Sequence, residues 1–306
     1  MSASQQLVST RVMLDNILFS TDFSEAAQAA LPYALALAKH YGSTLHTVHV
    51  LPELSILLHT DAENPVTFES AYEAERRKAL ERIKLLSPQI ADLPHHIYAR
   101  RGNTWEVISG LVAAQNIDLL ILGTHGRTGI GKLVLGSVAE EVLRNSLRPV
   151  MTVGPRARVK HEFDASGKNI RPIEIGFRHI LVATDFVDES LAAVPFAVSL
   201  AEEFQTKLGL LHVIEPQRPT PGGAALERLE NLVPQEARLW CRPASILKFG
   251  SPGERILETA AECNSDLIVM GVRTRKALLA SATHFPWSTA HRVIVEAACP
   301  VLTVRK

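Results

Sequence analysis

Hydrophobic positions along this chain fall into two alternating patterns. Short apolar runs without charge, such as 17–21 and 150–153, are typical of strands that are buried on both faces of a sheet. Between such runs, apolar residues return every three or four positions, which is typical of helices that cover a sheet. The alternation of strand and helix predicts a parallel, doubly wound α/β sheet.

The first half of the chain shows this pattern most clearly. Its first helix is expected to begin after Ser24, whose side chain can cap it, and to end before Gly42. Pro32 lies inside that helix and predicts either a kink or a later start. Strands are expected at 17–21, 45–50, 96–100, 118–123 and 150–153, and further helices at 68–86, 104–115 and 137–147.

The second half of the chain repeats the first. Three segments recur in the same order, for example Asn-Ile-Leu-Phe-Ser-Thr-Asp-Phe against His-Ile-Leu-Val-Ala-Thr-Asp-Phe. They begin at residues 16 and 179, at 45 and 208, and at 148 and 299. Because these matches keep their order, we expect two copies of one module, at 1–153 and 178–306, joined by a proline-containing, charged linker at 154–177.

Composition excludes several classes of protein. The 306 residues are 46% hydrophobic and 21% charged, which excludes a disordered or fibrous chain. Lys plus Arg and Asp plus Glu both number 32, so the net charge is zero and no nucleic-acid groove is expected. No run of about 18 apolar residues predicts a membrane span, and residues 1–6 lack the apolar core of a signal peptide. The scattered cysteines, Cys241, Cys263 and Cys299, predict no disulfide framework and favour a reducing, cytoplasmic location.

The candidate binding site lies at the carboxyl ends of the strands. Asp22, Val50 and Gly123 each fall at an expected strand end. Ligands of doubly wound sheets bind at that edge, where the strand order reverses. The sequence therefore predicts one crevice that these three residues share.

A glycine-rich loop follows the fourth strand. It holds five glycines in the fourteen residues from Gly123 to Gly136, and Ser137 opens the next helix. Exposed amides before a helix can bind an anion, and Arg127 and Lys132 add positive charge. The alternative is a glycine-rich surface loop without a ligand.

Two better-known phosphate motifs are excluded. Residues 126–133 nearly spell a P-loop, but Leu133 stands where a Ser or Thr would bind magnesium, and the loop follows the fourth strand rather than the first. A dinucleotide fingerprint after the first strand is also absent from the sequence.

The spacing Gly123-x2-Gly126-x9-Gly136-Ser137 resembles the ATP-binding signature of the universal stress protein family. The Thr21-Asp22-Phe23-Ser24 segment and the His49-Val50 strand end are similar to that family as well. The resemblance covers nearly the whole chain as two tandem modules. It implies a Rossmann-like fold of the adenine nucleotide alpha hydrolase type, with the two modules packed as a pseudo-dimer.

What the resemblance implies about the site is specific. The adenosine would lie near Asp22 and the backbone of Val50, the polyphosphate in the glycine loop, and Mg²⁺ or Mn²⁺ on the phosphates, with no metal site made by the protein. Asp22 has an alternative role as a helix cap, and His125 has one as an ordinary loop histidine. The implied ATP-binding residues are Thr21, Asp22, Val50, Leu122, Gly123, His125, Gly126, Arg127, Gly136, Ser137 and Val138.

The second copy departs from this pattern. Thr274 stands in the place of Gly126 and Trp287 in the place of Gly136. The loop from Gly271 to Ser288 is also three residues longer than its counterpart. We therefore expect one nucleotide per chain, held by the first copy. The first copy has about 15 additional residues near 54–66 or in the following helix, which form either a lid or an exposed loop.

The resemblance implies a cytoplasmic, nucleotide-dependent stress or regulatory protein with an unidentified protein partner. The alternatives are a slow ATPase or phosphotransferase and an interaction scaffold with a structural nucleotide. No Asp or Glu lies between Gly123 and Ser137, so no catalytic residue is expected and ATP hydrolysis should be slow at most. We further expect the modules to pack face to face, with strands 150–153 and 301–304 paired. A homodimer remains open.

Overall fold

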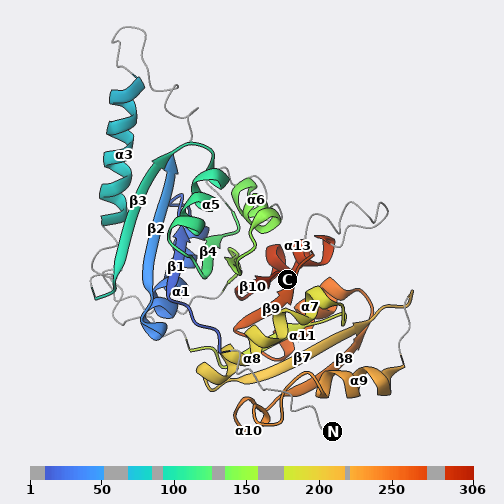
Figure 1. Cartoon of the computed structure of the whole chain (residues 1–306). Coiled ribbons are helices and arrows are strands. Elements are labelled where there is room, and N and C mark those ends of the chain that lie inside the picture. Colours follow the sequence, from blue (N-terminus) through green and yellow to red (C-terminus); the bar gives the residue numbers. More distant parts are fainter. Residues whose placement is uncertain are drawn as a thin grey trace, which may run out of the picture.

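The computed structural model describes residues 11–51, 68–84, 92–125, 135–157, 176–217, 221–273 and 287–306. Within these residues ten strands form one continuous sheet, in the order β3-β2-β1-β4-β5-β10-β9-β6-β7-β8. Figure 1 shows the first module in blue and green and the second in yellow and red. Strands within each module run parallel, which confirms the predicted doubly wound α/β fold.

The elements follow the expected alternation. The first module contains β1 (Asn16–Ser20), α1 (Glu25–Tyr41), β2 (Thr44–Leu51), α3 (Phe68–Lys84), β3 (His95–Arg101), α5 (Thr104–Ala114), β4 (Leu119–Gly123), α6 (Ser137–Asn145) and β5 (Val150–Val153). The second contains β6 (His179–Ala183), α7 (Asp188–Leu191), α8 (Ala193–Glu203), β7 (Lys207–Ile214), α9 (Gly222–Glu230), α10 (Arg238–Cys241), β8 (Ala244–Phe249), α11 (Pro252–Glu262), β9 (Leu267–Gly271), α13 (Trp287–Glu296) and β10 (Val301–Val304).

Helices cover both faces of the sheet, so its central strands are apolar on both sides. In β1, Ile17 and Phe19 pack into the core under α1 and α8, while Leu18 packs into the core under α5, α6, α11 and α13. Successive side chains of a strand point to opposite faces, which accounts for this division. Each of these two cores contains residues of both modules.

The proline of the first helix has a different effect in each module. α1 starts and ends as predicted, because the Ser24 side chain accepts a hydrogen bond from Ala27 N and Gly42 adopts a left-handed φ of 68°. It runs through Pro32 without interruption. In the second module the corresponding stretch divides at Ala192 into α7 and α8, and Pro195, lacking an N–H, cannot bond to the carbonyl of Leu191.

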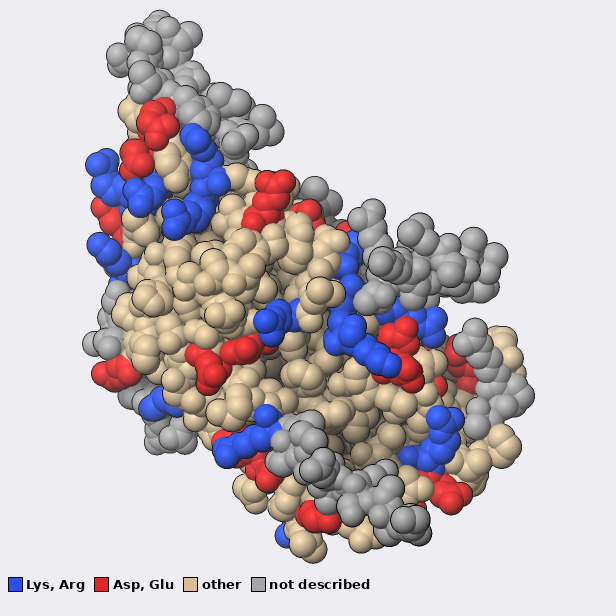
Figure 2. All heavy atoms as spheres, in the orientation of Figure 1, with Lys and Arg blue, Asp and Glu red and all other residues tan. Residues whose placement is uncertain are grey.

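Helix α3 holds part of the extra length of the first module. It has 17 residues, against 9 in α9. Its surface carries ion pairs one turn apart, Glu73 with Arg76 and Glu75 with Lys78. Figure 2 shows basic and acidic side chains mixed here and over the rest of the described part of this face. The segment 54–66, which we considered as a lid, lies outside the described residues.

The modules join through their last strands, as predicted. β5 and β10 pair antiparallel, with Met151 opposite Leu302. Thr152 donates its hydroxyl to the Val301 carbonyl and Thr303 donates to the Val150 carbonyl, both at 3.2 Å, so the junction has approximate two-fold symmetry. The prediction of face-to-face packing was wrong, because the pairing of strand edges extends one module's sheet into the other.

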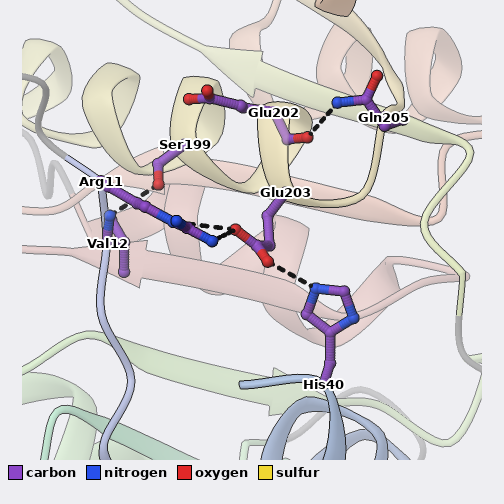
Figure 3. Close-up of polar contacts among 7 residues, drawn as sticks. All are labelled: Arg11, Val12, His40, Ser199, Glu202, Glu203 and Gln205. Atoms are coloured by element: carbon purple, nitrogen blue, oxygen red, sulfur yellow. Dashed lines mark hydrogen bonds and ion pairs between the residues drawn. The ribbon is translucent and has the colours of Figure 1, made fainter. Parts of the chain in front are cut away.

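A second junction lies at the carboxyl ends of α1 and α8, shown in Figure 3. The Glu203 carboxylate accepts hydrogen bonds from Arg11 Nη2 at 2.8 Å and pairs with His40 Nε2 at 3.0 Å. The His40 ring also stacks on Phe204, with centroids 4.3 Å apart. Val12 N donates to the Ser199 hydroxyl at 2.7 Å, which anchors the segment before β1 to α8.

Glu203 provides a test of this junction. Burial acts to raise the pKa of Glu203, but the hydrogen bonds and charges of Arg11 and His40 outweigh it and hold that pKa below the usual value. A carboxylate with a lowered pKa stabilises the fold above its unfolded-state pKa, about 4.3, and this stabilisation is lost as the pH falls through the folded-state pKa. Glu203→Gln should therefore lower the free energy of unfolding by about 1 kcal/mol at pH 7 and by progressively less below pH 4.

The measurement is the thermal unfolding midpoint of both proteins between about pH 3 and pH 8, a range that spans the titration of a carboxylate. Glu202→Gln is the matched control, because Figure 3 shows that side chain pointing away from the cluster. A deficit in Glu203→Gln that is the same at every pH would contradict a charge-dependent junction.

Candidate functional site

The carboxyl ends of β1 and β4 lie side by side at the point where the strand order reverses. β1 pairs with β2 on one side and with β4 on the other, and Ser20 lies opposite Leu122. The chain leaves β1 toward β2 and leaves β4 toward β5, so the two connections diverge. Asp22 and Gly123 therefore lie at the ends of neighbouring strands at this switch point, which is where doubly wound sheets bind their ligands.

The turn after β1 is held by its own side chains. Thr21 N donates to the Val48 carbonyl at 2.9 Å, and Phe23 N donates to the Thr21 hydroxyl at 3.0 Å. Phe23 has a φ of 63°, in the left-handed region, and Asp22 Oδ1 accepts a hydrogen bond from Ser24 N at 3.0 Å. Because Ser24 caps α1, Asp22 orders the turn and does not supply the cap.

His49 ties this turn to the neighbouring strand. Its Nδ1 donates to the Thr21 carbonyl at 2.7 Å, and its ring lies 4.6 Å from that of Phe23. The Arg82 guanidinium, from α3, stacks 4.0 Å above the Phe23 ring. Three elements of the first module thus meet at one aromatic ring.

The second module repeats this arrangement. His212 Nδ1 donates to the Thr184 carbonyl at 2.8 Å, Phe186 has a φ of 64°, and Arg228 lies 4.2 Å above the Phe186 ring. Because the arrangement recurs in the module whose glycine loop is lost, the histidine, the phenylalanine and the arginine above it hold the turn whether or not a glycine loop follows. Sequence reasoning missed Arg82 and Arg228, because they stand at different distances along the chain from the phenylalanines they cover.

Gly123 is required by packing. A Cβ at this position would lie 2.5 Å from the Ala26 carbonyl carbon and 2.7 Å from Ala27 N, which no side chain tolerates. Gly271 has the same constraint, because a Cβ there would lie 1.9 Å from the Glu189 carbonyl oxygen. The first glycine of the motif thus allows a helix to approach the strand end in both modules.

His125 lies between the two strand ends. Its carbonyl accepts a hydrogen bond from the Ser24 hydroxyl at 3.1 Å, which links the β4 loop to the start of α1. Its Nδ1 shares a hydrogen bond of 2.8 Å with the Thr124 hydroxyl. Its Nε2 is buried and has no hydrogen-bond partner within the described part of the chain. Burial lowers the pKa of His125, which favours the neutral ring at pH 7.

Helix α6 starts beside this histidine. Gly136 is its N-cap and supplies no side chain, whereas Ser24 caps α1 and Asn103 caps α5. Gly136 N donates to the Thr124 carbonyl at 2.8 Å, so the start of α6 is fixed to the end of β4. Ser137 is exposed at this first turn, whose amides lack partners within the helix.

The remaining predicted site residues fall into two groups. Val50 and Leu122 are buried, and Val138 packs partly against the same core, so these three form the apolar wall beside the strand ends. Gly126 and Arg127 lie outside the described residues, as do Lys132 and Thr274.

The corresponding crevice of the second module has a different charge arrangement. Arg273 stands two residues after Gly271, as His125 stands two after Gly123. Its Nη2 lies 3.6 Å from Asp185 Oδ2, so the carboxylate that corresponds to Asp22 faces a cation of its own module.

No group of three or more His, Cys, Asp or Glu side chains among the described residues is arranged to hold a metal ion. None of their helices combines the length and apolarity that crossing a membrane requires.

Comparison with known proteins gives the same relationship for both halves of the chain. The model of the universal stress protein family matches residues 13–154 and again 176–305. Universal stress protein MJ0577 of Methanocaldococcus jannaschii is 28% identical over 165 residues, covering 46% of this chain and 96% of that protein. A universal stress protein of Thermus aquaticus is 34% identical over 139 residues, covering 42% of this chain and 99% of that protein.

A solved structure matches both modules together. The universal stress protein of Archaeoglobus fulgidus superposes with a TM-score of 0.70 at 21% identity, over 95% of this chain and 98% of that one. The family model matches twice and covers most of the sequence, so this chain is a tandem, two-module member of the universal stress protein family.

Proposed function

We propose that the crevice of the first module binds ATP and that the chain acts as a nucleotide-dependent regulatory protein. One observation carries the proposal: an uncapped helix start at Gly136 is hydrogen-bonded to the end of β4, in the crevice that Asp22 flanks from β1. A nucleotide needs a polar group for its nucleoside and an anion site for its phosphates. Asp22 can supply the polar group, and the start of α6 can supply the anion site.

At the nucleoside end, the Asp22 carboxylate can accept hydrogen bonds from ribose hydroxyls. Asp22 is half-buried and oriented by the Ser24 amide, so little freedom is lost on binding. Val50 is the next-to-last residue of β2 and lies in its buried stretch, and its backbone and apolar neighbours suit an adenine ring.

At the phosphate end, the first amides of α6 and the Ser137 hydroxyl supply donors. Helix N-termini attract anions through unpaired N–H groups and through the helix dipole. The buried, unpartnered Nε2 of His125 is a further polar group for a ligand to satisfy. Gly126 and Arg127 would add to this site by the family motif.

A divalent cation would accompany the phosphates. The described residues at the α6 start offer amides, a hydroxyl and an imidazole, and Glu140 in the first turn is paired with Arg144 at 2.6 Å. Mg²⁺ or Mn²⁺ prefers oxygen ligands and keeps several waters, so phosphate oxygens and water would supply most of its coordination. The cation would neutralise phosphate charge, and the protein's contribution is to orient the phosphates.

Asp22 and Asp185 form a matched pair for testing the site. Titration of ATP into the full chain should give one site, with Asp22→Asn weakening both ATP and adenosine by about 10- to 100-fold, because hydrogen bonds to a charged group contribute about 1.5–3 kcal/mol. Asp185→Asn removes the corresponding carboxylate of the second module and should leave both affinities unchanged. Two equal sites, or equal effects of the two variants, would refute the assignment.

Cyclic AMP is a useful comparison ligand in the same titration. A universal stress protein that is 24% identical to 42% of this chain has been crystallised in complex with cAMP. Binding of cAMP in preference to ATP would support the proposed nucleotide site and would show that its ligand is a cyclic nucleotide.

His125 predicts how ATP affinity depends on pH. Because burial lowers its pKa, the ring is neutral at pH 7 and gains a proton only below the usual pKa of about 6.5. A protonated ring beside the polyphosphate adds attraction, so ATP affinity should rise several-fold between pH 7 and pH 5.5. The rise should be absent in His125→Gln and absent for adenosine, which has no phosphate. An equal rise for adenosine would place the titrating group elsewhere.

Hydrolysis of ATP should be very slow, at most about one turnover per minute. Fast phosphoryl transfer needs a positioned water and a clamp on the cation, whereas this crevice supplies amides that hold ground state and transition state alike. Phosphate release by purified protein gives the rate, with Asp22→Asn as the control for contaminating activity. A rate above about one per second that is lost in the variant would instead favour the alternative of an ATPase.

A further inference from the structure

The last residues of the chain reach from the second module into the first. Arg305, directly after β10, donates a hydrogen bond from Nη2 to the Leu143 carbonyl in the last turn of α6. Carbonyls at the end of a helix lack partners within it, and a cation there also interacts favourably with the helix dipole. Lys306, the next residue, instead pairs with Asp188 of its own module at 2.6 Å.

The same place on the other side of the junction is occupied by a glycine. Gly154 directly follows β5, as Arg305 follows β10. A Cβ at Gly154 would lie 3.5 Å from the carbonyl of Ile294, which stands six residues before Pro300 as Leu143 stands six before Pro149. The backbone contact is therefore symmetric, but a guanidinium reaches only α6.

Both of these contacts lead to the nucleotide crevice. Leu143 stands six residues after Ser137, so the start of α6 and the carbonyl that Arg305 holds are about 9 Å apart along one rigid element. A Cβ at Gly154 would lie 3.6 Å from the Thr124 hydroxyl, and Thr124 is bonded both to the start of α6 and to the end of β5. The second module thus contacts the far end of α6 directly, and Ile294 of that module lies next to Gly154, which in turn lies next to Thr124.

We propose that Arg305 is a positioning residue for the phosphate end of the nucleotide site, and that through it the second module responds to the nucleotide held by the first. The proposal rests on the proposed function. An anion at the start of α6 and a cation at its end stabilise the same helix and the same dipole, so each favours the other. Such coupling is reciprocal: the guanidinium strengthens ATP binding, and ATP strengthens the hold of α6 on the end of β10.

This arrangement assigns the two modules different roles. The second module has Arg273 beside Asp185, and the position from which a side chain of the first module could reach α13 is a glycine, Gly154. The second module contributes the Arg305 side chain to the end of α6.

The test compares ATP and adenosine binding by four full-length proteins. Arg305→Ala should weaken ATP binding by about 5- to 10-fold, within the usual range of coupling between sites, and leave adenosine binding unchanged. Arg305→Lys keeps a cation at the carbonyls and should restore most of the affinity. Lys306→Ala is the matched control and should bind both ligands as the wild type does. Equal ATP affinity in wild type and Arg305→Ala would overturn the proposal, and so would an equal loss for adenosine.

Amide hydrogen exchange of the wild-type chain tests the same idea without any substitution. ATP should slow exchange in α6 and in residues 287–306, whereas adenosine should slow it only around β1 and β2. ATP binding without protection of 287–306 would overturn the coupling and leave the proposed function intact. Failure of the wild type to bind any nucleotide would overturn the proposed function itself, and the coupling with it.

Discussion

The edge pairing of β5 and β10 is the constraint on which the rest of the structure depends. Each module alone would end in a short, apolar strand with unpaired backbone groups, which is a site for association. Antiparallel pairing satisfies those groups and places Met151 and Leu302 at the centre of one sheet. The carboxyl ends of α1 and α8 then meet on one face of the sheet. On the other face, α6 contacts the residue that follows β10, and α13 contacts the residue that follows β5.

Comparison of the two modules separates residues that build the fold from residues that can serve a ligand. The left-handed Phe23 and Phe186, their histidine partners and the two crowded glycines recur with nearly the same distances. Among the described residues, the first module has His125 two residues after its crowded glycine and Gly136 as the N-cap of α6, whereas the second has Arg273 two residues after its own. A motif shared with a family is thus partly architectural, and the two modules differ mainly at the phosphate end of the proposed site.

Local chemistry explains which features the sequence could predict. The period of apolar residues, the cap at Ser24 and the left-handed Gly42 depend on neighbours within a few positions, so strands, helices and their order were predictable. The crevice followed from strand order alone. The break at Ala192 could not be predicted from the proline, because Pro32 and Pro195 have the same local preference, yet α1 continues through Pro32. The contact of Arg305 with Leu143 joins residues 162 apart, and no local pattern indicates it.

Tandem fusion also changes what an interface near a two-fold axis can contain. In a dimer of identical modules, each position near the axis meets a copy of itself, so a charge there faces a like charge. His40 and Glu203 occupy equivalent positions, each 18 residues after the aspartate of the first turn, and they form an ion pair. Gly154 and Arg305 are equivalent too, yet only one carries a side chain. Because the two halves are covalently joined, each could change independently to complement the other. The contact of Arg305 with α6 therefore occurs once in this chain, whereas a symmetric dimer would have to make it twice.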